Sequence, residues 1–199
     1  MDIGSTFEIL VWFAGGLRNS FEHWMNRICY RALQFWAALQ NPQLQDNELE
    51  LVKSILTTPQ MHLFNKLQNS EKKHGIRVLK TLVGEGETNP DLITAALIHD
   101  IGKTVYPLRL WERVLIVIGK RFFPHLHQEW GTRKPVGLAR PFVVALNHSQ
   151  WGAELAQKAG ASSMVITLIR EHETVLESND QKSLKNRLLH ALQQADNQN

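Results

Sequence analysis

The chain has 199 residues, of which 43% are hydrophobic and 21% are charged. This composition is ordinary for a globular protein and excludes a low-complexity or fibrous chain. The formal net charge of +3 is too small to indicate a nucleic-acid partner by itself. A single cysteine, Cys29, excludes an intrachain disulfide and a cysteine-based zinc site, and it fits a reducing, cytoplasmic setting.

Two apolar runs without charges, 9–17 and 114–119, are the longest in the sequence. Both fall short of the ~20 residues that a membrane-spanning helix requires. The acidic residues Asp2 and Glu8 stand where a signal peptide would carry basic ones. We therefore expect neither a spanning helix nor a secretory leader.

Helical periodicity dominates the first part of the chain. Apolar residues recur at three- and four-residue steps over 21–39, which predicts an amphipathic helix. Another helix is expected to begin with Thr58 as its cap and Pro59 in its first turn, and a helix through His74 is expected to stop at the GEGE stretch, 84–87. We expect residues 1–58 to form an N-terminal helical extension that packs on the main domain, mediates a homodimer, or does both.

The main domain, 59–199, has the same helical character. Asn89 and Pro90 predict the start of a helix that ends near His99, after which Gly102 is expected to make the turn. Further helices are expected over 107–123, 141–147, 149–159, 163–175 (capped by Ser162) and 182–195, with 124–137 as a loop. No strand pattern is convincing, so the predicted fold class is all-α, a helical bundle.

Potential metal ligands recur at intervals along this domain: His74, His99, Asp100, His148, His172 and Asp196. A helix with its return loop takes about the 24 or 25 residues that separate most of them, and the gap of 48 allows two passes. Facing helices of a bundle can therefore bring these side chains to one centre. Mixed nitrogen and oxygen ligands suit divalent Mn, Fe, Zn, Ni or Co, and six ligands favour a dinuclear site with Asp100 as the bridge.

Five motifs follow one another along the chain: HGIRVL, AALIHDIGK, NHSQWGAELAQKAGAS, LIREHE and LLHALQQAD. Their order is similar to that of a known family of metal-dependent enzymes. Over roughly residues 60–196 the chain resembles the HD-domain metal-dependent phosphohydrolases, and the later spacing is most similar to the HD-GYP branch. That branch's Gly-Tyr-Pro motif is absent after LIREHE. The resemblance implies that the same six residues bind two metals, that Asp100 bridges them, and that Lys103 contacts a phosphate.

The ligand set and the resemblance together predict hydrolysis of a small phosphorylated, nucleotide-like substrate. Asp100 and Lys103 are the expected catalytic residues, with Glu173 (or Glu171) moving a proton or orienting the adjacent His172. Arg140, or another cation of the insert 105–140, is expected to extend the phosphate pocket. The alternative is a non-catalytic signalling or scaffold protein of the same fold, but the complete ligand set favours the enzyme.

The insert 105–140 is strongly basic, with seven Lys or Arg against two Glu and therefore a charge of +5. Within 107–123, Arg109, Glu112, Arg113 and Lys120 fall on one helical face, opposite an apolar face. The favoured interpretation is a buried helix of the domain. The alternative is a basic amphipathic helix that lies on a membrane surface or against a partner.

Overall fold

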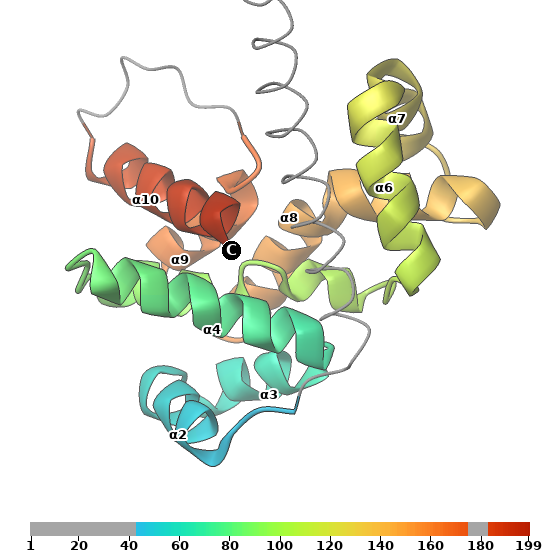
Figure 1. Cartoon of the computed structure of the whole chain (residues 1–199). Helices are drawn as coiled ribbons and strands as arrows, with labels where there is room; N and C mark the ends of the chain where they lie inside the picture. The colour runs from blue at the N-terminus through green and yellow to red at the C-terminus, as the bar shows by residue number, and fades with distance from the viewer. Residues whose placement is uncertain (1–42, 175–182) are drawn as a thin grey trace, which may run out of the picture. The chain divides into compact units, whose positions relative to one another are not determined.

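The structure, a computed structural model, describes residues 43–174 and 183–199 (Figure 1). The described residues form one compact unit of helices and contain no strand, which confirms the predicted all-α fold class. The α-helices in chain order are α2 (Asp46–Ile55), α3 (Thr58–Lys66), α4 (Asn69–Gly84), α5 (Pro90–Ile98), α6 (Leu110–Phe122), α7 (Pro124–Gly131), α8 (Arg140–Lys158), α9 (Ser163–Glu171) and α10 (Leu184–Gln198). Two 3₁₀ helices, η1 (Ile101–Thr104) and η2 (Gly137–Ala139), flank the α6–α7 pair. The helix predicted over 21–39 and the proposed dimer through it lie outside the described residues.

Helix α5 runs through the hydrophobic core and is buried on nearly all sides. Five of its side chains are at most 1% exposed: Leu92, Ala95, Ala96, Leu97 and Ile98. Helices α4, α9 and α10 pack around it, and α2 and α3 contact it as well. Burying each large aliphatic side chain stabilises the fold by about 1.5–3 kcal/mol. This rigid centre fixes the C-terminal end of α5, where His99 and Asp100 follow.

Helix α2 belongs to the same core as α5. Its Val52 is fully buried, and Leu56, which follows the helix, is 7% exposed. Both residues lie within the segment 1–58. Because residues 1–42 are not described, the division of the chain at residue 58 stays a prediction.

The predicted helix starts are largely confirmed. The Asn89 side chain accepts hydrogen bonds from the backbone N–H groups of Asp91 and Leu92, and Pro90 occupies the first turn of α5. The Ser162 hydroxyl caps α9 in the same way. The cap of α3 was placed one residue late, because Thr57 rather than Thr58 precedes the first helical residue.

Two predicted elements were wrong. Residues 140–158 form a single helix, α8, where two helices were expected, since the polar run from Asn147 to Gln150 continues the helix instead of ending it. Residues 124–131 form helix α7 instead of a loop, with Pro124 in the first turn. Its end packs closely on α8, where a Cβ at Gly131 would lie 2.8 Å from the Leu146 side chain.

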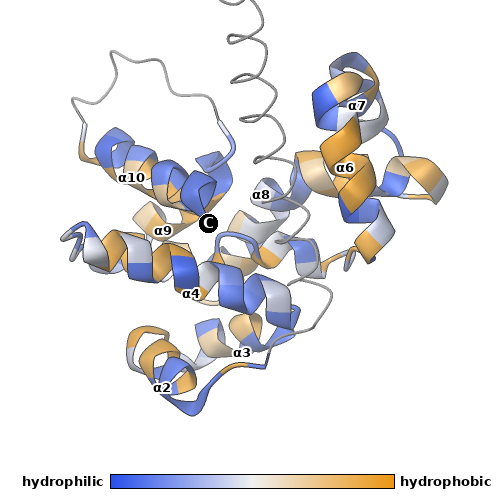
Figure 2. Ribbon diagram, in the orientation of Figure 1, coloured by the Kyte–Doolittle hydropathy of each residue, from blue (hydrophilic) through white to orange (hydrophobic). Residues whose placement is uncertain are grey.

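Helices α6 and α7 form a projecting arm that rests on α8 (Figure 1). The main hydrophobic cluster includes no residue between Ile101 and Ala153, so the arm lies outside it. Only Glu112 and Gly119 of α6 are buried. The expectation of a buried α6 was therefore wrong, because its main contacts among the described residues are with α7 and α8 only. Figure 2 shows that α6 is rich in hydrophobic residues, and several of these side chains, Trp111, Val117, Ile118 and Phe122, are exposed.

Candidate metal centre

All six predicted ligands come together at one place in the bundle. His74 lies within α4, and His148 lies within α8. His99 and Asp100 occupy the junction between α5 and η1, His172 directly follows α9, and Asp196 lies near the end of α10. Gln193 of α10 donates hydrogen bonds to the backbone carbonyls of His172 and Thr174, which fixes the turn after α9.

The cluster consists of two groups that share one carboxylate. His74, His99 and Asp100 form the first, and Asp100, His148 and His172 the second; within each, the potential ligand atoms lie within 4.8 Å of one another. Asp196 Oδ1 joins the first group, 2.7 Å from His74 Nε2 and 3.5 Å from His99 Nε2. In the second group, His148 Nε2 and His172 Nε2 are 3.2 Å apart. The two adjacent groups thus have one carboxylate, that of Asp100, in common.

The buried imidazoles are oriented by the backbone. The Nδ1–H groups of His99, His148 and His172 donate to carbonyl oxygens one turn earlier, at 3.0, 3.0 and 2.7 Å respectively. When such a ring is neutral, a proton fixed on Nδ1 leaves the lone pair on Nε2, directed at the cluster, as in metal-binding histidines.

His99 Nε2 provides the test of whether the cluster fits a metal. This atom is buried and has no hydrogen-bond partner, a state that costs about 1–3 kcal/mol when nothing compensates it. Two carboxylate oxygens lie near it, Asp196 Oδ1 at 3.5 Å and Asp100 Oδ1 at 3.8 Å. A divalent cation would satisfy the nitrogen and both carboxylates at once, so the donor set fits a metal ion.

Gly102 brings η1 against the backbone of α8. A Cβ on this residue would lie 1.8 Å from the carbonyl oxygen of His148 and 2.7 Å from the backbone nitrogen of Gly152. Gly102 lies in η1, the turn that follows His99 and Asp100, as expected, and its φ is not positive. The glycine is needed because the two backbones approach so closely, and this approach sets the 3.5 Å between Asp100 Oδ1 and His148 Nε2.

Lys103 is paired with the shared carboxylate. Its Nζ lies 2.6 Å from Asp100 Oδ2. Burial disfavours the charged form of Asp100, but Lys103 and His99 outweigh burial and hold the pKa of Asp100 well below its ordinary value. Burial likewise opposes the charge of Lys103, yet Asp100 raises the pKa of this lysine. The lowered pKa of Asp100 and the raised pKa of Lys103 both favour the ionised form. Asp100 is the carboxylate shared by the two groups, and Lys103 lies against its other oxygen, Oδ2.

The two groups differ in their affinity for positive charge. Burial opposes the charge on His99, but Asp100 and Asp196 outweigh it and raise the pKa of His99 to about 9. Burial and then Lys103 lower the pKa of His148 to about 4, and burial lowers the pKa of His172. A cation at the first group is favoured by two carboxylates, and the second group offers neutral imidazoles, the protonation state that binds metals.

A cavity of about 250 Å³ opens beside His148. Cationic side chains from η1 and α6 line it, together with an apolar wall and Glu173. The lining residues are Lys103, Leu108, Arg113, Ile116, Lys120, Ala145, His148 and Glu173. Arg113 and Lys120 were not singled out from the sequence, although both were placed on one face of the predicted helix.

Glu173 is the carboxylate that faces this cavity. Its Oε2 lies 3.0 Å from Lys120 Nζ, and its Oε1 lies 3.9 Å from His148 Nε2. Two other sequence candidates lie elsewhere. Glu171 pairs with Lys185 of α10 at 2.9 Å, and Arg140 bonds to Glu112 and to the carbonyl of Pro107 instead of lining the cavity.

The fold and the cluster together define a helical protein with a candidate metal site of four imidazoles and two carboxylates, one of which, Asp100, is shared by both groups. The sequence pattern of the HD domain matches residues 62–197, more than half of the chain, and the chain therefore belongs to the HD-domain family, part of a superfamily of metal-dependent phosphohydrolases. This confirms the resemblance at the level of the superfamily, whereas membership of the HD-GYP branch stays a prediction. Neither the curated proteins nor the solved structures gave a match.

Proposed function

We propose that this protein is a metal-dependent phosphohydrolase that uses water to cleave a phosphoester of a small, nucleotide-like substrate. One observation carries the proposal: two groups of potential ligand atoms, from residues that are buried except for the half-buried His74, share Asp100. Paired divalent ions a few ångströms apart are typical of enzymes that hydrolyse phosphoesters.

The proposed ligands are His74, His99 and Asp196 for one ion and His148 and His172 for the other, with Asp100 serving both. Ions of the Mn, Fe, Zn, Ni or Co type, when bound by these residues, would lower the pKa of water and place positive charge against the phosphoryl oxygens. The chain's own contribution is orientation. The backbone carbonyls hold the three buried imidazoles, and Lys103 holds the shared carboxylate.

The cavity beside His148 is the proposed substrate site. Its cations, Lys103, Arg113 and Lys120, suit an anionic group, and charge-assisted hydrogen bonds to phosphate are roughly twice as strong as neutral ones. Its apolar wall, Leu108, Ile116 and Ala145, suits the uncharged part of the substrate. Glu173 lies at the same cavity, within reach of a water or a leaving group beside His148, and is the proposed proton carrier.

The test combines metal analysis of the purified protein with a panel of phosphoesters, assayed with Mn, Fe, Ni or Co supplied. We expect the wild type to hold a transition metal and to hydrolyse at least one substrate. Asp100→Asn should lose both properties while keeping its helical content. The matched control is Asp91→Asn, because Asp91 is an aspartate outside the cluster whose carboxylate accepts a hydrogen bond from Ser162.

A wild type that takes up no transition metal would contradict the proposal. Equal activity of wild type and Asp100→Asn would show that the hydrolysis uses another site. Metal binding without turnover of any substrate would instead favour the non-catalytic signalling or scaffold protein.

A further inference from the structure

Large hydrophobic side chains are exposed mainly on and around the arm. Among the described residues, they gather between 105 and 146 far more than elsewhere, and they include Trp111, Ile118, Phe122, Phe123, Val136 and Leu138. The surfaces of monomers rarely carry contiguous apolar patches larger than a few hundred Å². A concentration of exposed apolar side chains of this kind indicates a surface that binds a partner.

On α6, three of these side chains form a stripe. Trp111, Ile118 and Phe122 follow one another at steps of seven and four residues, and they are 46%, 41% and 66% exposed. Steps of four and seven place residues on the same side of a helix. Gly119 and Glu112, the buried residues of α6, lie at intervening positions that face the rest of the molecule.

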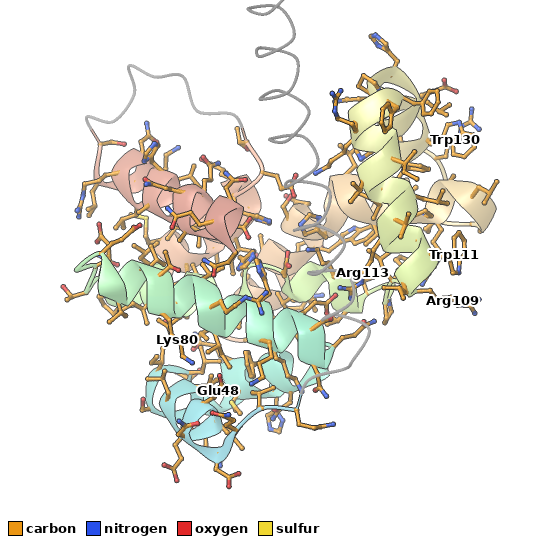
Figure 3. The ribbon with its side chains drawn as sticks, in the orientation of Figure 1. Glu48, Lys80, Arg109, Trp111, Arg113 and Trp130 are labelled. Carbon is orange, nitrogen blue, oxygen red and sulfur yellow. The ribbon has the colours of Figure 1, made fainter. Side chains whose placement is uncertain are left out.

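Two hollows continue this surface across the arm. The first, of about 470 Å³, is lined by Arg109, Trp111, Glu112, Gly137, Leu138 and Arg140. The second, of about 390 Å³, is lined by Trp130, Arg133, Lys134, Val136, Leu138 and Ala139. Leu138 lines both hollows, so they adjoin. Figure 3 shows Arg109, Trp111 and Trp130 on the side of the arm that faces away from α4.

The charge of this surface is positive. Arg109, Arg133 and Lys134 line the hollows. The one carboxylate among the lining residues, Glu112, is buried and paired with Arg140. The Arg133 guanidinium also lies over the Trp130 ring, 5.5 Å from its centroid. Arg133 also pairs with Glu129 of α7. The hollows thus combine aromatic and aliphatic surface with four lining cations and a single lining carboxylate.

We propose that the outer face of the arm, formed by Arg109, Trp111, Trp130, Arg133, Lys134 and Leu138, docks on a membrane surface that contains anionic lipids. Tryptophan, with an apolar ring and a polar N–H, suits the boundary between headgroups and acyl chains. Arginine and lysine extend apolar stems toward the same boundary and leave their charges among anionic headgroups. None of the described helices is long and apolar enough to cross the bilayer, so this contact lies on the surface.

The test is co-sedimentation of the full chain with vesicles of phosphatidylcholine alone or mixed with phosphatidylserine. We expect binding to the mixed vesicles at low salt, weaker binding at high salt, and little binding to phosphatidylcholine alone, because salt screens the attraction between cations and anionic lipids.

Two double variants of the outer face test which residues bind. Arg133→Glu with Lys134→Glu should weaken binding to mixed vesicles at least about tenfold, since each basic residue near an anionic surface contributes about 1 kcal/mol. Trp111→Ser with Leu138→Ser should also weaken binding to mixed vesicles. It should change the salt dependence of binding less than the charge reversal does. The matched controls change exposed residues elsewhere: Lys158→Glu with Arg170→Glu, and Val83→Ser with Leu184→Ser. Thermal unfolding of each variant verifies that it is folded.

Absence of binding to mixed vesicles overturns the proposal. So does an equal loss of binding in the control variants, which would point to net charge or to another part of the chain. If light scattering shows that the arm variants change the oligomeric state and leave vesicle binding unaltered, the outer face is a protein–protein interface instead.

Discussion

Gly102 shows how one missing methyl group can determine the geometry of the metal centre. Adding a Cβ would force the α8 backbone away from η1, and the atoms in its path are a carbonyl oxygen and an amide nitrogen, which cannot rotate aside. We expect Gly102→Ala to destabilise the fold by about 3 kcal/mol or more, at or beyond the upper end for overpacked sites. Separating Asp100 from His148 should also lower metal uptake. Denaturant unfolding and metal titration measure the two effects.

The matched control for this prediction is Gly84→Ala. A Cβ on Gly84, the last residue of α4, meets nothing within 4 Å, and its φ is not positive. This variant should keep the stability and the metal affinity of the wild type. If Gly102→Ala behaves like Gly84→Ala, the close approach of η1 to α8 does not control the centre.

Lys120 and Arg121 are adjacent cationic residues of α6 that face different surroundings. Lys120 lines the cavity beside His148, whereas Arg121 does not. If phosphorylated substrates bind there, Lys120→Ala should raise KM about tenfold, the effect of losing roughly 1.4 kcal/mol of binding free energy. Arg121→Ala should leave KM unchanged. Steady-state kinetics on the best substrate of the panel compare the two, and equal KM values for both variants would place the substrate elsewhere.

At the scale of elements, a buried glutamate connects α2 to α4. Glu48 pairs with Lys73 and with Lys80, both of α4, and Figure 3 shows Lys80 above Glu48 between the two helices. Its carboxylate also accepts a hydrogen bond from the backbone N–H of Gln45, at the start of α2. Mainly because of Lys73, the pKa of Glu48 falls from its ordinary 4.5 to about 2.

This lowered pKa predicts how stability depends on pH. Between the two pKa values the unfolded chain binds more protons than the folded one, so the contribution of Glu48 is complete above about pH 4.5 and is lost as the pH falls toward 2. Glu48→Gln should therefore be less stable than the wild type by about 1–3 kcal/mol at pH 7. The difference should shrink through the same pH range. Urea unfolding at several pH values measures it.

The control for this pair is Glu50→Gln, a change of an exposed glutamate on the same helix. It should alter stability by less than about 0.5 kcal/mol at any of these pH values. A constant difference between wild type and Glu48→Gln from pH 7 to pH 2 would show that the ion pairs with α4 do not stabilise the fold.

At the scale of the whole molecule, the cluster predicts that metal stabilises the fold. Its ligands come from α4, α5–η1, α8, α9 and α10, so the complete set exists only in the folded state. A ligand at 100 times its Kd stabilises the native state by about 2.7 kcal/mol, and this should raise Tm by about 5–10 °C for a chain of this size. Calorimetry of metal-free protein with added Mn²⁺ or Co²⁺ measures the shift.

Asp91→Asn should show the same increase in Tm as the wild type, and Asp100→Asn should show little or none. A wild-type Tm that does not respond to any of the proposed metals would argue that the cluster is held together without a cation.

The fold class and the six cluster residues could be predicted from the sequence because both follow from local spacing. Periodic apolar residues indicate helices, and ligands separated by one helix and its loop return to the same end of a bundle. Other features depend on tertiary packing. Helices over 141–147 and 149–159 were expected, yet α8 continues through position 148, where the His148 side chain is buried. Helix α6 is apolar enough to be buried, but the described residues place only α7 and α8 extensively against it.

The positions of Arg113 and Lys120 show the same limit. Helical periodicity placed them on one face of α6, but it could not show which structure that face meets. In the fold it meets the cavity beside His148, while Arg140, also a candidate, is turned away to pair with Glu112. The charge pattern of one helix therefore predicts which residues share a face. The packing of neighbouring helices decides whether that face lines a cavity or meets solvent.

The contact between His74 and Asp196 joins residues that are 122 positions apart. During synthesis the chain makes His74 long before Asp196, and closing so long a loop is entropically costly. A metal ion held by this pair would therefore join distant parts of the chain, unlike the metal of zinc fingers, whose ligands are close in sequence. The first group, which includes Asp196, can be completed only after α10 has joined the bundle, so a metal ion in that group would report that α4, α5 and α10 have been made and assembled.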